Sequence, residues 1–542
     1  MSTDATPIKR IGILLPSASI GFLVFYLIRP TITLTLATLL FVGLLSLSLR
    51  WPEVGTLVVL FTMYSNISVL AMRSAAAIEA SAGSPDKNPR IIAVLGAMSL
   101  FLAIPLFYRM FIRKEKLIID LGFILMLIYL TTRLASSFFS NDQPTLVSQA
   151  GDFLFEGLAL YFLLNNVIWD FSVLRRAIWA LLFAGSLMAS VTLYQKVTHT
   201  EKNNYGGFAQ ADFGPKVDPE KKESIERLRA SGKISAGGTN VGDVRAAGPI
   251  GGSNEYGQIL LVLLPLAVLQ FRTESSRTLR TFAAGATGLI LGGLILTYSR
   301  GCLLAAIVVF GMMIGMGLLK PRHALVSALA AGLLITFLAP NVVTRMESLG
   351  RLKGLFSRSI SSDQAPDSSA VYRYVLDVAL WHVFLDHPVL GVGPGQFAKH
   401  YSSDYVNRVG VIEQSKNYMA HNLYLETLAE GGLVGSASFL SILIATMYGL
   451  WKTRSRFKQS RPEFAFVASA FFLALSGHAI SSIFAHLAYQ RYFYLLLALS
   501  SATIRIMHFI SEKEAMDELP THRNAIPKNK LLRLKAEDAY SE

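Results

Sequence analysis

The stretch RTFAAGATGLILGGLILTYSRGCLLAAIVVFGMMIGMGLL, residues 280–319, decides the fold class. It holds two apolar runs of membrane-spanning length, 280–298 and 301–319, joined by the short turn Thr297-Tyr-Ser-Arg-Gly301. A transmembrane helix needs about 20 consecutive apolar residues, and each run supplies nearly that number. The stretch therefore predicts two helices that cross a membrane one after the other.

The composition of the whole chain points the same way. Its 542 residues are 52% hydrophobic and only 16% charged, whereas soluble proteins carry about 25% charged residues. Such a chain cannot cover itself with polar surface, and it falls outside the compositions of disordered and collagen-like proteins. Cys302 is the only cysteine, which excludes a disulfide scaffold. We expect an all-α polytopic membrane protein with about 12–14 transmembrane helices.

Apolar runs of spanning length follow one another along the chain. The run 150–168 is the weakest, because it carries Asp152 and Glu156, and the first two runs are separated only by Arg29 and Pro30. The first run lacks a small-residue cleavage site and is followed at once by another run, so we expect no removable signal peptide. The fourteen runs lie near 11–28, 32–49, 54–71, 91–111, 117–138, 150–168, 174–194, 254–271, 280–298, 301–319, 323–339, 427–450, 463–485 and 489–509.

Lys and Arg in the short connections set the expected orientation. If Lys9 and Arg10 lie in the cytoplasm, every other basic short loop does too, which requires an even number of spans and both termini inside. The net charge of +14 is then mostly a topology signal, with some affinity for anionic membrane lipids. Basic residues are not interleaved with aromatic residues on a soluble face, so we expect no nucleic-acid partner.

This orientation divides the chain into six parts and sends two long segments to the outer side, the first at 195–253 and the second at 340–426. The second contains an amphipathic run, Val371 to Leu385, stopped at Asp386-His387-Pro388; we expect a helix that lies on the membrane or caps the bundle. The first has one helix start, Asp218-Pro219, in what is otherwise expected to be a mobile solvated loop. The parts are N-terminal transmembrane helices at 1–194, an outer loop at 195–253, central transmembrane helices with a Ser-Arg-Gly turn at 254–339, an outer loop with the amphipathic helix and His421 at 340–426, C-terminal transmembrane helices at 427–509 and a cytoplasmic tail at 510–542.

Four polar clusters stand out, and under this topology all of them lie on the outer side. Three of the four begin or end an apolar run, where a side chain can meet both the membrane surface and a substrate from outside. The clusters are Arg245-Ala-Ala-Gly248-Pro-Ile-Gly-Gly-Ser-Asn254; Thr297-Tyr298-Ser299-Arg300-Gly301; Tyr372-Arg373 with Asp386-His387-Pro388-Val-Leu-Gly391-Val-Gly393-Pro-Gly395; and His421-Asn422-Leu-Tyr424-Leu-Glu426-Thr-Leu-Ala-Glu430-Gly431-Gly432.

Each cluster also fits a purely structural role. Arg300 can extend to lipid head groups, and Arg245 can belong to the solvated loop. Asn422 suits a helix N-cap, and the two acids Glu426 and Glu430 suit the first turns of a helix through its dipole. The glycines at 391, 393 and 395 suit a tight turn, because no strand–loop–helix context supports a nucleotide site there.

In this order, Arg…Gly…Asn, Ser-Arg-Gly, His-Pro-x-x-Gly-x-Gly and His-Asn-x-Tyr-x-x-x-x-x-Glu-Gly, the clusters resemble the O-antigen ligase and polymerase superfamily. These are bacterial integral-membrane glycosyltransferases, and the resemblance covers about 245–435. The chain departs from the family in its long outer loop before His421 and in a span count above the usual twelve or so. The resemblance implies a GT-C-like fold in the bacterial inner membrane, with a periplasmic active site.

The resemblance also implies the reaction and its partners. The donor would be a glycan on undecaprenyl diphosphate, and the acceptor a hydroxyl of another glycan, of lipid A–core or of another molecule. Arg300 and Arg245 are the candidates for holding the diphosphate, because a guanidinium takes two phosphate oxygens and keeps its charge. His421 is the candidate general base, since a histidine with its ordinary pKa of about 6.5 is partly neutral near pH 7.

The remaining candidate residues have secondary roles. Arg373 is a further candidate for anion binding, and Asn422 and Tyr424 are candidates for orienting His421 or the sugar. Asn254, at the end of the first cluster, is a secondary candidate without an assigned role. No Asp-x-Asp pair lies beside the outer clusters, so we expect no metal site and no cofactor.

Other functions remain open on the sequence alone. A repeat-unit polymerase of the same superfamily would use the same donor chemistry. A flippase or transporter for a lipid-linked glycan would carry ionisable residues near the bilayer midplane and related halves with broken helices. Most runs have uncharged middles, and no repeat is apparent, which favours the transferase over a transporter or a non-catalytic assembly protein.

Overall fold

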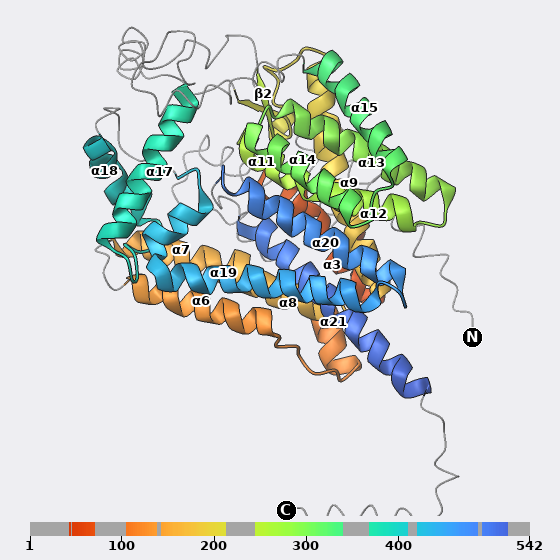
Figure 1. The fold of residues 1–542 in the computed structure, drawn as a ribbon. Helices are drawn as coiled ribbons and strands as arrows, with labels where there is room; N and C mark the ends of the chain where they lie inside the picture. The colour runs from red at the N-terminus through yellow and green to blue at the C-terminus, as the bar shows by residue number, and fades with distance from the viewer. Residues whose placement is uncertain are drawn as a thin grey trace, which may run out of the picture.

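The computed structural model describes residues 43–44, 46–70, 104–137, 142–212, 244–339, 368–409, 420–485 and 490–518 (Figure 1). Within these residues the chain is almost entirely helical. The helices pack around one large apolar core, in which Tyr64, Phe153 and Tyr256 are among the largest fully buried side chains.

Seven of the described helices are long and apolar enough to cross a membrane, and four more are apolar but shorter. These eleven, seven plus four, coincide with eleven of the predicted runs. The runs 11–28, 32–49 and 91–111 lie wholly or largely outside the described residues. The all-α polytopic membrane fold is confirmed. The long helices are Thr145–Val167, Phe171–Val197 (α9), Ser253–Thr273, Arg277–Leu296 (α13), Leu423–Phe457 (α19), Pro462–Ser481 (α20) and Arg491–Glu514 within α21 (Gln490–Glu518), and the shorter ones are Pro52–Tyr64 (α3), Leu121–Ser137 (α6), Arg300–Gly315 (α14) and Pro321–Phe337 within α15 (Pro321–Leu338).

Two of the long helices are built from shorter pieces. Thr145–Val167 joins α7 (Gln143–Asp152), a π-helical segment (Phe153–Ala159) and α8 (Leu160–Val167), and Ser253–Thr273 joins α11 (Ser253–Leu261) to α12 (Leu263–Thr273). Side-chain caps fix two helix starts, since Asp142 accepts from the backbone N–H of Thr145 at 3.2 Å and Asp170 from that of Val173 at 2.8 Å. The run with Asp152 and Glu156 is thus a complete helix. Two further short elements are a π-helical turn at Tyr108–Ile112 and a 3-10 turn at Tyr205–Gly207.

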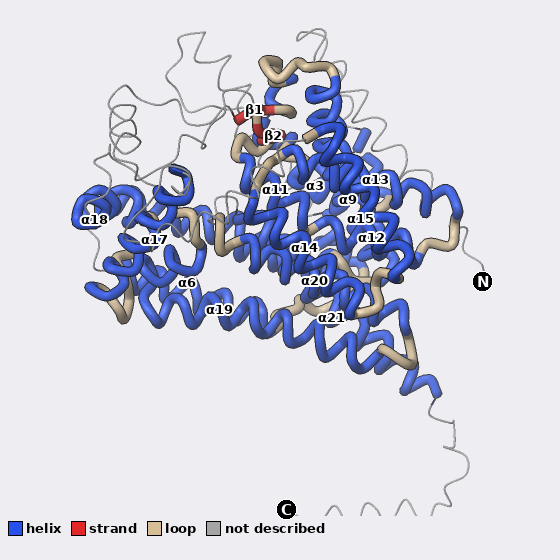
Figure 2. Tube along the Cα trace, turned by 45° about the horizontal axis from the view of Figure 1, so that its top comes forward, coloured by secondary structure: helices blue, strands red, loops and turns tan. Residues whose placement is uncertain are grey.

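Two short strands, which the sequence did not predict, lead into α11. Strand β1 (Gln210–Asp212) pairs antiparallel with β2 (Arg245–Gly248) (Figure 2). In this register Asp212 lies opposite Arg245. The end of the first outer loop is therefore ordered, whereas the predicted helix start at Asp218-Pro219 lies outside the described residues.

The amphipathic helix of the second outer loop is present as α17 (Ser368–Asp386), and it ends before Pro388 as predicted. It stands with α18 (Ser402–Val409) at one end of the molecule, away from α12 and α13 (Figures 1 and 2). Its buried stripe packs against the start of α19, so it caps the bundle. The stripe consists of Val375, Leu376, Ala379, Leu380 and Val383.

The glycine-rich loop after α17 is joined to a break in α19. Gly432 has φ 60° and ψ −162°, a backbone conformation that interrupts the helix and is essentially restricted to glycine. The loop fills the break, since Gly393 donates its N–H to the carbonyl of Glu430 at 2.9 Å, and Leu433 donates its N–H to the carbonyl of Pro388 at 2.8 Å. The tight-turn interpretation of these glycines is thus correct, and their role is to bring two backbones together.

Candidate functional site

Strand β2 holds the side chain of Arg245 in a set of polar contacts. Its Nε donates to the carbonyl of Thr297 at 3.1 Å, and a terminal nitrogen donates to Oδ1 of Asn254 at 2.9 Å. The other terminal nitrogen lies 3.5 Å from the carboxylate of Asp212 on β1. Arg245 is therefore fixed to the protein and does not belong to a solvated loop.

Asn254 connects β2 to the turn that precedes α14. Its Oδ1 accepts from the hydroxyl of Ser299 at 2.9 Å as well as from Arg245, and its backbone carbonyl accepts from the thiol of Cys302 at 3.3 Å. Arg245 and Ser299, about 50 positions apart in the chain, thus both bind the side-chain amide of Asn254. The Arg…Asn and Ser-Arg-Gly patterns are therefore in direct contact in the fold.

Arg300 is the first residue of α14, directly after this turn. Its side chain is buried, with 8% exposure, which argues against a side chain that extends to lipid head groups. The glycine after it is required by space, because a Cβ at Gly301 would lie 2.6 Å from the Cβ of Phe484. The turn is therefore in close contact with segment 482–485, which follows α20.

The same segment also contacts the start of α19. The backbone N–H of Leu423 donates to the carbonyls of Ser482 and Ala485, at 3.0 and 3.1 Å. Segment 482–485 therefore lies against both the Ser-Arg-Gly turn and the turn that carries His421. These two motifs, about 120 residues apart in the sequence, share one neighbour in the fold.

At the start of α19, Asn422 is the N-cap. Its Oδ1 accepts from the backbone N–H groups of Tyr424 and Leu425, at 3.1 and 3.3 Å. The structural role considered for this asparagine is therefore real. Tyr424 donates its hydroxyl to the carbonyl of Ala479 in α20 at 2.7 Å, so its polar end is engaged on another helix and not on His421.

Helix α17 contributes a carboxylate that the sequence did not single out. Asp377 accepts a hydrogen bond from the side chain of Asn422 and lies within the electrostatic influence of Arg373. Burial raises the pKa of Asp377 to about 6 from its ordinary 3.8, and Arg373 and Asn422 counteract part of that shift. The signal available in the sequence was an Arg–Asp pair at i,i+4 beside the apolar stripe.

Two further contacts bring the clusters together. The ring of Tyr372 meets the imidazole of His421 edge to face, with centroids 6.3 Å apart. Arg373 and Arg245 both act electrostatically on the thiol of Cys302. Arg245 and Asn254 therefore meet at the turn before α14, within the electrostatic influence of Arg373, and α17 and segment 482–485 connect this region to the start of α19.

Arg133 on α6 is a second ionisable residue that the sequence did not single out, and it acts on two carboxyl groups of α19. Arg133 donates to the hydroxyl of Tyr129 at 3.1 Å and acts electrostatically on Glu426 and Glu430. Glu430 accepts from the backbone N–H of Phe397 at 3.3 Å, so it holds the glycine-rich loop and does more than favour a helix start. An arginine in the apolar run 117–138 was the available signal.

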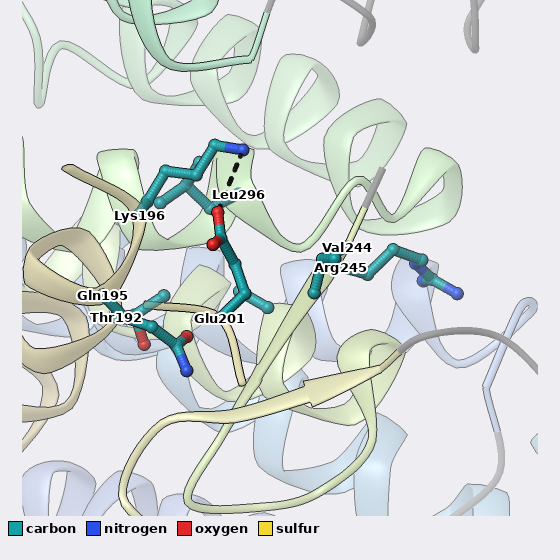
Figure 3. A pocket seen from close by; sticks show the side chains of 8 residues that line it. Thr192, Gln195, Lys196, Glu201, Val244, Arg245 and Leu296 are labelled. Carbon is teal, nitrogen blue, oxygen red and sulfur yellow. Dashed lines mark ion pairs between the residues drawn. The ribbon is translucent and has the colours of Figure 1, made fainter. Parts of the chain in front are cut away.

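A small pocket lies beside β2 (Figure 3). One wall carries an ion pair between Lys196 and Glu201, with Nζ and Oε1 3.7 Å apart. Figure 3 shows the side chain of Arg245 directed away from this pair, so the guanidinium faces the Asn254 side of the strand. The pocket is lined by Thr192, Gln195, Lys196, Glu201, Val244, Arg245, Ala246 and Leu296.

Metal ligands were not expected at the site. Across the part of the chain that the structure describes, no group of three or more His, Cys, Asp or Glu side chains is arranged to hold a metal ion.

Comparison with known proteins identifies one family. Residues 285–440 match the family model described as O-antigen ligase. The match begins in α13 and ends in α19, so it includes Arg300, Arg373 and His421, whereas Arg245 and Asn254 precede it. No curated protein matches the chain.

Proposed function

We propose that this chain, whose residues 285–440 match the O-antigen ligase family model, moves a glycan from undecaprenyl diphosphate to an acceptor hydroxyl at the periplasmic face of the bacterial inner membrane. The observation that carries the proposal is the contact of segment 482–485 with both the Ser-Arg-Gly turn and the start of α19. That contact supports a single site in which cationic side chains and His421 act together.

The arginines would serve the donor. A lipid diphosphate is already an activated leaving group, so the protein must stabilise the charge that develops on it when the bond from the anomeric carbon to the phosphate oxygen breaks. Arg300 and Arg245 suit this task, with Arg373 as a further anion ligand. Asn254 would hold Arg245 in position, because its Oδ1 accepts from that guanidinium at 2.9 Å.

His421 would serve the acceptor. A neutral imidazole takes the proton of the incoming hydroxyl as its oxygen bonds to the anomeric carbon, and undecaprenyl diphosphate leaves on the opposite side. The configuration at that carbon is inverted by such a single displacement. General-base assistance of this kind typically contributes about 10²–10⁴-fold in rate. Asn422 positions the turn and Tyr424 anchors it to α20. The proposed step uses no metal ion.

The central experiment measures release of undecaprenyl diphosphate by the purified protein from a lipid-linked glycan and a hydroxyl acceptor. We expect His421→Ala to abolish release while the protein stays folded. The matched control is His400→Ala, because His400 is half exposed and pairs with Asp142 at 2.9 Å, and the proposed mechanism gives it no role. Full turnover by His421→Ala would refute the assignment of the base.

A second experiment identifies the acceptor. A ligase and a polymerase share the donor chemistry, so the lipid-linked intermediate that accumulates in a deletion strain separates them. Single repeat units would indicate a polymerase, and long chains a ligase. Labelling of the variant His421→Cys by a membrane-impermeant reagent tests the proposed periplasmic position of the site.

A further inference from the structure

Helix α17 packs against the start of α19 by apolar contacts that fix its rotation. Val375, Leu376 and Ala379 of α17 belong to a small core together with Ala420 and Ala429 on either side of the first turns of α19. A helix held by such a stripe directs its neighbouring polar residues at defined positions. The polar residues next to the stripe therefore have fixed partners on α19.

Two of these residues contact the turn that carries the candidate base. Tyr372 lies edge to face against the ring of His421, and Asp377 accepts from the side chain of Asn422. His421 and Asn422 are adjacent in the chain, so two successive residues of the turn are each held by a different residue of α17.

Both the oxygen and the NH₂ group of the Asn422 side chain form hydrogen bonds. Its oxygen accepts from the backbone N–H groups of Tyr424 and Leu425, and its NH₂ donates to Asp377. A reversed amide would direct NH₂ donors at backbone N–H donors and its oxygen at a carboxylate, so only one orientation satisfies all partners. The carboxylate of Asp377 therefore selects the cap geometry of α19.

We propose that Asp377 is a positioning residue for the transferase: through the amide of Asn422 it fixes the turn that holds the imidazole of His421 toward the site. The role of Asp377 in the reaction rests on the proposed function, whereas its effect on the His421 turn does not. Arg373, one turn earlier on α17, keeps the carboxylate in its charged, hydrogen-bond-accepting form.

The test measures the rate at which diethyl pyrocarbonate modifies His421 in the purified protein, followed by mass spectrometry. A hydrogen bond to a charged group shifts a conformational equilibrium by about tenfold or more, so Asp377→Ala is expected to raise the modification rate of His421 about tenfold. Asp377→Asn keeps a side-chain acceptor and is expected to stay close to the wild-type rate. Modification of His421 at the wild-type rate in Asp377→Ala would overturn the proposal.

Two further variants separate this role from general stability. Asn422→Asp keeps the helix cap but loses the NH₂ donor, so it should raise the modification of His421 as Asp377→Ala does. Asp386→Ala removes a carboxylate from the same helix whose partner is the hydroxyl of Tyr405, at 2.6 Å, and it should leave His421 at the wild-type rate. Equal increases in Asp386→Ala and Asp377→Ala would mean that α17 has merely loosened, and would refute a specific role.

Kinetics complete the test. If His421 is the base, Asp377→Ala should lower kcat about tenfold and leave KM for the lipid-linked donor unchanged, because the main diphosphate ligands Arg245 and Arg300 are untouched. An unchanged kcat together with faster modification of His421 would contradict the role in the reaction. If His421→Ala itself keeps full turnover, the proposed base is wrong, and the modification rates still decide whether Asp377 positions the turn.

Discussion

The break in α19 provides a sharp test of how the glycine-rich motifs work. A Cβ at Gly432 would lie 2.3 Å from the carbonyl oxygen of Val389, and the backbone there is in a region essentially closed to other residues. The loop cannot move aside easily, because the carbonyl of Val389 accepts from the N–H of Val434 at 3.2 Å. Backbone strain of about 1–3 kcal/mol and overpacking of a similar size predict that Gly432→Ala lowers the free energy of unfolding by about 2–6 kcal/mol.

Two neighbouring glycines provide matched controls for Gly432→Ala. A Cβ at Gly435 meets nothing within 4 Å, so Gly435→Ala, in regular helix, should stabilise the protein by about 0.5–1 kcal/mol. At Gly431 the nearest atom is the backbone nitrogen of Ser436 at 3.8 Å, an ordinary contact, so Gly431→Ala should be tolerated.

Unfolding by SDS titration, followed by tryptophan fluorescence, measures all three glycine variants. We expect Gly432→Ala alone to fall well below the wild type and to lose turnover, since the loop that it displaces holds Glu430 through Phe397. Wild-type stability of Gly432→Ala, or an equal loss in Gly435→Ala, would refute the close approach of the two backbones.

Three further predictions follow from the site. Arg245→Ala should lower the free energy of unfolding by about 2–3 kcal/mol, because it removes charge-assisted hydrogen bonds to Thr297 and Asn254 and leaves Asp212 without this partner. Arg245→Lys should retain most of the stability but bind the lipid-linked donor more weakly. Wild-type donor affinity in Arg245→Lys would count against the role of Arg245 in phosphate binding. The pKa of Asp377 is about 6 in the folded protein against 3.8 ordinarily, so between these pH values the folded state binds a proton that the unfolded state has lost. The stability of the wild type should therefore fall as the pH rises from about 4 to about 6. Unfolding midpoints of Asp377→Asn should lack this decline, and parallel curves for the two proteins would contradict the assignment. EDTA should leave glycan transfer unchanged in the release assay, and inhibition reversed by added Mg²⁺ would show that the reaction needs a metal ion.

Much of the fold could be predicted because a bilayer imposes one demand on every segment that crosses it. Backbone groups must be paired within the segment, so apolar runs of spanning length become helices whatever surrounds them. This is why eleven predicted runs coincide with described helices, including 150–168 despite its two acids. The stop of α17 before Pro388 and the N-cap at Asn422 were also predictable, because they depend on residues adjacent in the chain.

Other features depend on residues far apart in the chain and could not be predicted. Asp377 was not singled out in the sequence, and only the packing of α17 on α19 brings it to Asn422. Tyr424 fits a role beside His421 by spacing alone, yet its hydroxyl is bound to Ala479 in α20. Strand β2 at Arg245 could not be predicted, because its partner strand lies more than thirty residues earlier in the chain.

The sequence by itself therefore determined that this protein is a helical membrane protein with a resemblance to the O-antigen ligase superfamily, and which residue types carry its proposed chemistry. The tertiary structure decided which of them meet. Arg245, Asn254 and Ser299 share one set of hydrogen bonds, and segment 482–485 joins their turn to the start of α19. The physical reason is that spanning length and helix caps are local properties of the chain, whereas the burial of a charge and the approach of two backbones depend on contacts between segments far apart in sequence.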